Sequence, residues 1–233
     1  LAAAISLPRD SAVPKIFDEL TQVTYKLAGW VLTILPVGLF AITFQLAQKI
    51  DFSTLTALGQ LAGIVFAATL FHGLVVLPTI AWLVSGKNPL QFLRAVSQPM
   101  VTALFTSSSA ATLPLSMQTA QDKLGVDQAR SAFVLPLGAT ANMDGTALFE
   151  GIAAVFLAYM FGVELGTTGV IAIFLVAMLS SVGAPGIPSG SMAGMQMVLV
   201  AVGIPLEAIG LLLLIERPLD TFRTAVNVEG DLV

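Results

Sequence analysis

Long uncharged stretches alternate with short polar connectors along this chain. The uncharged stretches cover residues 27–48, 52–86, 95–121 and 165–206. A membrane-spanning helix needs about 20 mainly apolar residues, so each stretch is long enough to cross a bilayer, and the longest could enter and leave it. The pattern therefore predicts an all-α integral membrane protein with several spans.

Two of these apolar stretches are interrupted near their middle. A serine-rich segment breaks the third stretch at about residues 107–112, and glycine, proline and serine residues break the last stretch at residues 183–191. The second break holds two prolines and three glycines, which cannot continue a helix. We therefore expect two hairpins of half-length helices, at residues 92–121 and 165–206.

Each expected hairpin is followed by a span that contains polar residues. The first such span covers residues 131–163 and is broken at 138–146, and the second covers residues 208–233. Each polar segment follows its hairpin tip by about 35 residues. Paired interrupted segments of this kind predict an inverted-repeat secondary transporter fold with two re-entrant helical hairpins and broken helices.

Charged residues are scarce and unevenly placed. They make up 10% of the 233 residues, and the mean hydropathy is +0.92, which excludes disorder, a nucleic-acid-binding surface and an ordinary cytosolic enzyme. The absence of cysteine excludes disulfides and thiolate chemistry. Lysine and arginine concentrate in the leading segment and in the loops that carry Lys87 and Lys123, which predicts that these segments face the cytoplasm of a multi-pass protein in the plasma or bacterial inner membrane.

The final span carries a polar face. This face is formed by Asp220, Arg223, Asn227 and Asp231. Their spacing places them within an arc of about 80° on a helix. Each charge at mid-bilayer costs roughly 2.5 to 3.5 kcal/mol, so the face must meet partners or water inside a bundle. A solvated helix at the membrane surface is the alternative, because Glu229 lies off this face.

Two further carboxylates, Asp144 and Glu150, lie in a span that is otherwise uncharged. Asp144 has oxygen-bearing neighbours, which suit a desolvated hard cation. Carboxylates satisfied by hydroxyl groups at a helix kink are the alternative, and this explains Glu150 well. By ligand chemistry alone Met143 would be a packing residue, and the single histidine, His72, would be hydrogen-bonded locally.

Four sequence strings resemble the glutamate transporter family, the dicarboxylate/amino acid:cation symporters. They are Thr-Ser-Ser-Ser at 106–109, Asn-Met-Asp-Gly-Thr at 142–146, Gly-Ile-Pro at 186–188 and Asp-Thr-Phe-Arg-Thr-Ala-Val-Asn-Val-Glu-Gly-Asp at 220–231. The resemblance covers nearly the whole chain and implies the C-terminal part of that fold, with the first three spans and most of the fourth outside this sequence. Residues 1–51 would then be a remnant of the scaffold and residues 52–233 the transport domain.

The resemblance also implies where substrate binds. The implied substrate-binding residues are Ser107, Ser109, Thr146, Ile187, Ser191, Asp220, Arg223 and Asn227. In this assignment Asp220 holds the α-ammonium group, and the planar fork of Arg223 holds the side-chain carboxylate. Asn227 and the first hairpin tip hold the α-carboxylate. An acid at 220 with an arginine at 223 favours L-aspartate or L-glutamate as the substrate.

Sodium ions are implied as co-transported ligands, and no other cofactor is expected. One implied site uses the carbonyl groups of Gly138, Asn142 and Asn227 with the Asp231 carboxylate. A second uses the carbonyl groups of Thr140, Ser181, Val182 and Ala184 with the Met143 sulfur, in place of a packing role. A third uses Asn142 and Asp144 with ligands from the missing spans. Glu150 matches the position where proton-cotransporting members hold a glutamate, which makes it the hypothetical proton carrier.

These expectations describe a secondary active transporter, not an enzyme, that works by alternating access in the lipid bilayer. The resemblance implies a homotrimer for the full-length protein, and no nucleic-acid partner is expected. A proton-driven dicarboxylate or aspartate symporter is the alternative within carriers, and an ion channel is the alternative from another class, because re-entrant loops also build filters. An aspartyl protease that paired Asp144 with Asp220 or Asp231 would leave Arg223 and the two hairpins without a role. A serine hydrolase would have to combine Ser189 with His72.

Overall fold

The computed structural model describes most of the chain after residue 50. The described residues are 15–16, 19–20, 22–23, 26–27, 30, 33–34, 37–38, 40–41, 44 and 51–233. The chain divides into two compact units, Leu1–Lys49 and Ile50–Val233. The first expected span lies largely outside the described residues, so only the second unit is considered below.

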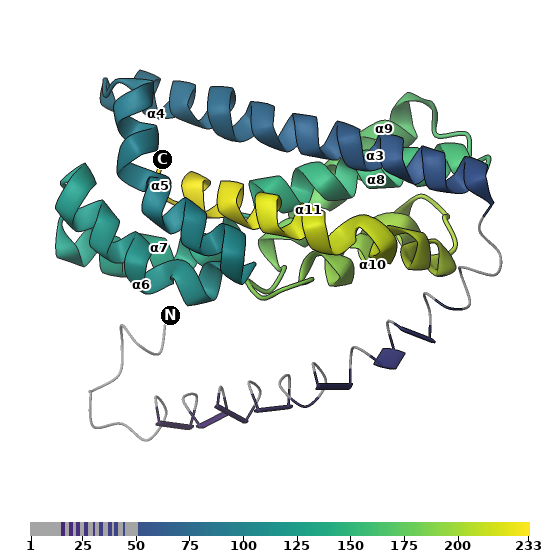
Figure 1. Ribbon diagram of the computed structural model, residues 1–233, viewed down its shortest axis with the longest axis horizontal. Coiled ribbons are helices and arrows are strands. Elements are labelled where there is room, and N and C mark those ends of the chain that lie inside the picture. The colour runs from purple at the N-terminus through teal and green to yellow at the C-terminus, as the bar shows by residue number, and fades with distance from the viewer. Residues whose placement is uncertain are drawn as a thin grey trace. The chain divides into compact units, whose positions relative to one another are not determined.

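The second unit consists of helices joined by short connections (Figure 1). Its α-helices are α3 (Phe52–Phe71), α4 (Leu77–Ser85), α5 (Pro89–Thr106), α6 (Ser109–Thr119), α7 (Gln128–Ala141), α8 (Asp144–Met160), α9 (Gly166–Val182), α10 (Ser191–Ala201) and α11 (Ile209–Gly230). A π-helical turn, His72–Val76, joins α3 to α4, and a second, Ala120–Leu124, follows α6. No strand occurs among the described residues, which confirms the expected all-α class for this part of the chain.

Local capping explains where the first long helix begins and ends. Asp51 accepts hydrogen bonds from the Thr54 backbone amide at 2.9 Å and from the Ser53 hydroxyl at 2.8 Å. Hydrogen bonds from Thr54 and then Ser53 lower the pKa of Asp51 to about 2. At the other end Gly86 adopts a left-handed conformation with φ of 71°, which terminates α4. The element made of α3, the π turn and α4 therefore has a defined first and last residue.

The break between α5 and α6 is narrower than the sequence predicted. Only Ser107 and Ser108 lie outside the two helices, and the chain is helical again from Ser109. Ser107 has a left-handed φ of 50° and ends α5, while the Ser108 side chain accepts the Ala111 amide hydrogen at the start of α6. Pro114 lies inside α6. The expectation of a break over residues 107–112 is therefore wrong, because two serines suffice to turn the chain and cap the next helix.

The other two interruptions differ in length. The connection between α9 and α10 covers residues 183–190, where glycines and prolines predicted it, and the break between α7 and α8 consists of Asn142 and Met143. Neither Met143 nor Gly190 caps its following helix with a side chain. The first-turn amides of α8 and α10 are thus left for other partners.

Helix α11 lies in the middle of the unit and packs against α3, α5, α6, α8 and α10 (Figure 1). One apolar core joins α3, α8, α9, α10 and α11 and includes Phe149, Leu157 and Met195. A second core joins α4, α5 and α7 and includes Phe92 and Val96. The central position of α11 surrounds its polar residues with protein.

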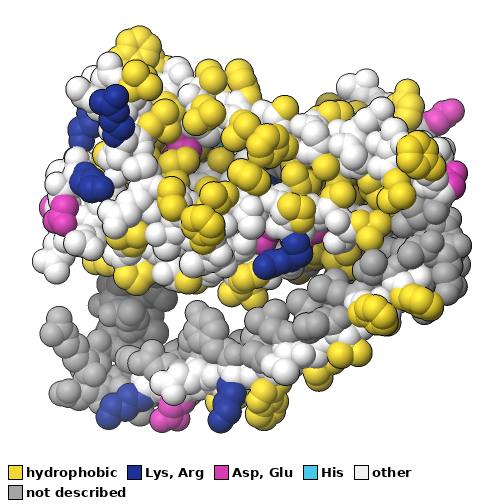
Figure 2. All heavy atoms as spheres, viewed as in Figure 1, with side chains coloured by type: hydrophobic (Ala, Val, Ile, Leu, Met, Phe, Trp, Pro, Cys, Tyr) yellow, Lys and Arg dark blue, Asp and Glu magenta, His cyan; other side chains and the backbone are white. Residues whose placement is uncertain are grey.

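The outer surface of the unit is rich in apolar side chains (Figure 2). Phe52, Leu83 and Val84 on the α3–α4 element are 84%, 71% and 77% exposed. Two stretches, Phe52–Ser85 and Gln128–Met160, are long and apolar enough to cross a membrane by length and composition, the second with the α7–α8 break inside it. This surface suits contact with lipid or with further apolar segments.

Candidate functional site

Three chain interruptions meet beside α11. The Ser108 hydroxyl at the α5–α6 break donates a hydrogen bond of 2.8 Å to the Gly186 carbonyl on the α9–α10 connection, which also accepts the Ala110 amide hydrogen at 3.3 Å. A Cβ atom at Gly186 would lie 2.9 Å from the Ala139 carbonyl oxygen near the end of α7. Only a glycine allows the backbone to approach this closely, so the three segments close over one another.

A small cavity lies where these segments meet, and its volume of about 10 Å³ has room for about one water molecule. The cavity is lined by seven of the eight predicted substrate-binding residues. These are Ser107, Ser109, Thr146, Ile187, Ser191, Asp220 and Asn227. Residues from four parts of the chain, the α5–α6 pair, the start of α8, the α9–α10 pair and α11, are thereby brought together in a conformation that encloses almost no space.

The first turns of three helices border this cavity. Ser109 lies at the start of α6, Thr146 at the start of α8 and Ser191 at the start of α10, and all three line the cavity. The N-terminus of a helix carries free amide hydrogens and the positive end of the helix dipole. The Ser191 hydroxyl is buried and has no hydrogen-bond partner among the described residues. The cavity is therefore suited to a negatively charged group.

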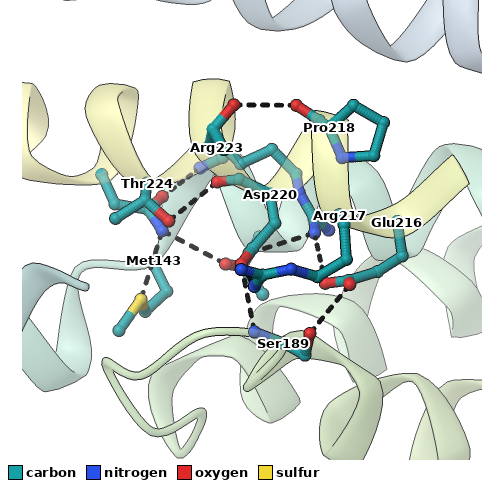
Figure 3. Close-up of polar contacts among 12 residues, drawn as sticks. Met143, Ser189, Glu216, Arg217, Pro218, Asp220, Arg223 and Thr224 are labelled. Atoms are coloured by element: carbon teal, nitrogen blue, oxygen red, sulfur yellow. Dashed lines mark hydrogen bonds and ion pairs between the residues drawn. The ribbon is translucent and has the colours of Figure 1, made fainter. Parts of the chain in front are cut away.

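Arg223 lies on α11 behind the cavity and is only 1% exposed. Its Nη2 atom donates to Glu216 Oε1 at 3.1 Å and to Asp220 Oδ1 at 3.2 Å (Figure 3). The guanidinium lies 3.9 Å from the ring centre of Phe149, which is a cation–π contact. Nε and Nη1 have no partner among the described residues. Two donor atoms of a buried arginine are thus unused, and either could donate to a carboxylate.

Ser189 connects the α9–α10 segment to the same carboxylates. Its backbone amide donates to Asp220 Oδ2 at 3.0 Å, and its hydroxyl donates to Glu216 Oε2 at 2.9 Å (Figure 3). Ser189 has a φ of 62°, in the left-handed region. Both oxygens of Asp220 and both oxygens of Glu216 are therefore engaged by protein donors.

Asn227 joins α11 to the start of α8. Its Oδ1 atom accepts the Gly145 amide hydrogen at 2.8 Å, and its Nδ2 atom donates to Thr146 Oγ1 at 3.2 Å and to Met143 Sδ at 3.3 Å. Every polar atom of this side chain is thereby used. Asn227 is held in a fixed orientation between the cavity and Met143.

The residues of the first implied sodium site lie together. Asn142 Nδ2 donates to Asp231 Oδ1 at 3.2 Å, and a Cβ atom at Gly138 would lie 2.8 Å from the same oxygen. The residues of the third implied site share a neighbour, because a Cβ atom at Gly230 would lie 2.7 Å from Asn142 Nδ2 and 3.1 Å from Asp144 Oδ2. The end of α11 therefore packs directly against the α7–α8 break.

The residues of the second implied site are spread around Met143. Met143 borders the small cavity together with Ala184, and it borders a larger apolar cavity of about 720 Å³ together with Ser181 and Val182. Thr140 lies on the exposed side of α7, where its hydroxyl donates to the Leu137 carbonyl. Met143 is thus placed between the residues of this set, and its sulfur already accepts the hydrogen bond from Asn227.

One expectation about a single residue was wrong, and one further carboxylate has an unexpected environment. His72 is not hydrogen-bonded locally, because its Nε2 atom lies 2.7 Å from Asp144 Oδ2 on another helix. Glu229, which lies off the polar face of the final span, is fully buried and neither of its carboxylate oxygens has a partner among the described residues. Burial of Asp220 and Arg223 also contradicts a solvated surface helix, since α11 is covered by protein on several sides.

The enzyme alternatives find no supporting geometry in the described residues. The Ser189 hydroxyl donates to Glu216, while His72 pairs with Asp144, so these two residues do not form a nucleophile–base pair. Asp220 pairs with Arg223 rather than with a second aspartate. Neither arrangement resembles the facing groups that hydrolysis requires.

Glu150 is buried behind Arg223, on α8. The Ser180 hydroxyl donates a hydrogen bond to Glu150 Oε2, while Oε1 has no partner among the described residues. Gly194 on α10 packs directly against this carboxyl group, where a larger residue would collide with it. The carboxyl group is thus held at the junction of α8, α9 and α10.

A family model and several known proteins match this chain over most of its length. A family model described as the sodium:dicarboxylate symporter family matches residues 1–233. The chain is 40% identical over 216 residues to Excitatory amino acid transporter 3 of Mus musculus, which covers 92% of this chain and 41% of that protein. It is 40% identical over 226 residues to Neutral amino acid transporter B(0) of Mus musculus, covering 96% of this chain and 41% of that protein.

A nematode relative gives a similar match. The Putative sodium-dependent excitatory amino acid transporter glt-4 of Caenorhabditis elegans is 40% identical over 221 residues, covering 93% of this chain and 44% of that protein. The chain therefore spans about two fifths of the length of these relatives. All three relatives are named as transporters, and they differ in whether the named substrate is an excitatory or a neutral amino acid.

Proposed function

Since this chain belongs to the sodium:dicarboxylate symporter family, we propose that it is the substrate-carrying part of a sodium-coupled symporter for L-aspartate or L-glutamate. The observation that carries the proposal is the small cavity bordered by three helix N-termini, with Asp220 at its wall and two unused Arg223 donors behind it. A carboxylate needs such donors, and an ammonium group needs the acid. The site thus suits an amino acid with a second carboxylate.

The coupling to sodium is proposed from shared residues. Asn227 borders the substrate cavity, binds the start of α8 and lies one helical turn before Asp231, which pairs with Asn142. A sodium ion ligated by Asp231 and the carbonyl groups of Gly138, Asn142 and Asn227 would therefore fix the same side chain that substrate contacts. Each ligand would stabilise the site for the other, which is the thermodynamic basis of symport.

The membrane arrangement follows the same proposal. We place the α5–α6 and α9–α10 pairs as re-entrant hairpins of an inverted repeat within a transport domain, residues 52–233. Lys87 Nζ donates to the Leu124 carbonyl at 2.5 Å, which ties the loop before α5 to the loop after α6 and supports a hairpin that leaves and returns on one side. Residues 1–51 would belong to the scaffold of a homotrimer in the cell membrane.

The proposal is tested by uptake of labelled aspartate into vesicles that contain the full-length protein. Sodium and pH gradients are varied independently, with glutamate, serine and succinate as competing substrates. We expect saturable uptake that requires sodium and is inhibited by glutamate but not by serine. Uptake driven by a proton gradient alone would favour a proton-driven symporter, and flux that does not saturate would favour a channel.

Replacing Glu150 with glutamine tests proton co-transport. Glutamine keeps an oxygen that can accept the Ser180 hydrogen bond but cannot carry a proton across the membrane. We expect Glu150→Gln to make sodium-driven aspartate uptake independent of an imposed pH gradient, while substrate exchange continues. Ser180→Ala removes the hydrogen bond and leaves the carboxyl group, so it serves as the matched control. Unchanged pH dependence in Glu150→Gln would exclude this residue as the carrier.

A further inference from the structure

Four residues form a closed ring of hydrogen bonds between the α9–α10 connection and α11. The Ser189 hydroxyl and backbone amide bind Glu216 and Asp220, and Arg223 Nη2 binds the other oxygen of each carboxylate (Figure 3). No other polar side chain is needed to complete the ring. The α9–α10 connection is thus fastened to α11 through a single residue, Ser189.

The ring uses groups that the substrate would need. Asp220 is the proposed partner of the α-ammonium group, but its Oδ2 atom is occupied by the Ser189 amide. Arg223 is the proposed partner of the side-chain carboxylate, and Glu216 occupies its Nη2 atom, while Nε and Nη1 have no partner among the described residues. With the ring closed the cavity is about 10 Å³, which is too small for an amino acid. The ring and a bound substrate are therefore mutually exclusive in this arrangement.

Ser189 adopts a conformation that requires such fastening. Its φ of 62° lies in the left-handed region, which is strained for a serine. Neither of its hydrogen bonds to α11 is local, since Glu216 and Asp220 lie 27 and 31 residues further along the chain. A strained residue persists where its surroundings hold it, and here both acceptors are buried carboxylates.

We infer that Ser189 is a positioning residue that latches the α9–α10 connection to α11 when no substrate is bound, through the carboxylates of Glu216 and Asp220. This inference rests on the proposed transport function. A carrier with alternating access must close twice in each cycle, once loaded and once empty. The latch supplies the empty closure, because the Ser189 amide occupies Asp220 in place of the substrate ammonium group and the closed cavity is too small for an amino acid.

The latch predicts a difference between two transport modes. Net uptake requires the empty carrier to close and return, whereas exchange of internal for external aspartate uses only the loaded carrier. The Ser189 hydroxyl donates to a carboxylate, and water replaces part of this hydrogen bond when the hydroxyl is removed, so we expect Ser189→Ala to slow net uptake about three- to tenfold. Exchange should stay within about twofold of the unsubstituted protein. A general folding defect would lower both rates together.

Matched variants separate the hydroxyl from the backbone. Ser189→Gly also removes the hydroxyl but tolerates the left-handed conformation, so it should slow net uptake as Ser189→Ala does. Ser97→Ala removes a hydroxyl that donates to the Arg94 carbonyl on α5, far from the ring, and should change neither mode. Normal net uptake in Ser189→Gly would overturn the latch, because the hydroxyl would then have no role.

A measurement without transport separates the latch from the proposed function. Hydrogen–deuterium exchange of residues 183–190 is followed in the full-length protein in detergent without substrate. We expect Ser189→Ala to accelerate exchange in this segment severalfold and Ser97→Ala to leave it unchanged. Unchanged exchange in Ser189→Ala would overturn the latch whatever the protein transports. Accelerated exchange in a protein that transports no acidic amino acid would support the latch and refute the proposed function.

Discussion

Replacing Arg223 with alanine is expected to lower the apparent affinity for aspartate and glutamate about 100-fold in the full-length protein, because the positive charge and its charge-assisted hydrogen bonding to the substrate carboxylate are lost. The unused Nε and Nη1 donors are the atoms that this prediction assigns to the carboxylate. The measurement is the concentration dependence of sodium-driven uptake. Arg223→Lys keeps the charge but not the planar fork, so it should recover only part of the affinity.

A second arginine on the same helix provides the control. Arg217 lies 3.5 Å from Asp220, and its side chain is 51% exposed, so its ion pair contributes little. Arg217→Ala should keep the affinity for aspartate within about twofold. The folded state of Arg223→Ala must be checked separately, because Glu216 and Asp220 lose their common partner. A folded Arg223→Ala protein with unchanged affinity for aspartate would contradict the assignment of the carboxylate to this residue.

The sequence predicted the polar face of α11 because helical spacing is a local property. Asp220, Arg223 and Asn227 recur at intervals of three and four residues, so their common face follows from helix geometry alone. Their burial follows from the cost of charge in an apolar environment. The glycine- and proline-rich segment at 183–190 was predicted for the same reason, since its backbone cannot continue a helix.

The partners of these residues could not be predicted in this way. The pairing of Ser189 with Glu216 and of His72 with Asp144 depends on how distant segments pack, and spacing along one helix carries no information about it. The environment of Glu229 could not be predicted either, because helical spacing places it opposite the polar face but does not say what that opposite side contacts. Since α11 is central, its opposite side is buried against α3 and the neighbouring π turn, where Glu229 packs beside Gly73.

The width of the first hairpin tip was misjudged for a related reason. Serine and proline are poor helix formers in isolation, which suggested a break through residues 107–112. In the structure Ser108 caps α6, and Pro114 lies within that helix. Tertiary contacts also hold the tip, because the Ser108 hydroxyl binds the Gly186 carbonyl on the other hairpin. Polar residues that read as a loop in the sequence therefore support the helix start.

Substituting alanine for two glycines of α8 should have opposite effects on stability. A Cβ atom at Gly145 would lie 2.9 Å from both the Arg223 carbonyl oxygen and Asn227 Oδ1, whereas nothing lies within 4 Å of the Cβ position at Gly151. Backbone atoms cannot move aside as a flexible side chain can, so Gly145→Ala forces α8 and α11 apart. Overpacking of this kind costs about 1 to 3 kcal/mol. Gly151→Ala should stabilise the helix by up to about 1 kcal/mol.

The thermal unfolding midpoint of the purified full-length protein tests this pair. We expect Gly145→Ala to lower the midpoint and Gly151→Ala to leave it unchanged or raise it. Gly145→Ala also displaces Asn227, whose Oδ1 accepts the Gly145 amide hydrogen at 2.8 Å. This variant therefore disturbs the residue proposed to join the substrate and sodium sites. Added sodium should therefore stabilise Gly145→Ala less than it stabilises the unsubstituted protein. Equal midpoints for the two variants would show that α8 and α11 do not pack this closely, and equal stabilisation by sodium would separate Asn227 from sodium binding.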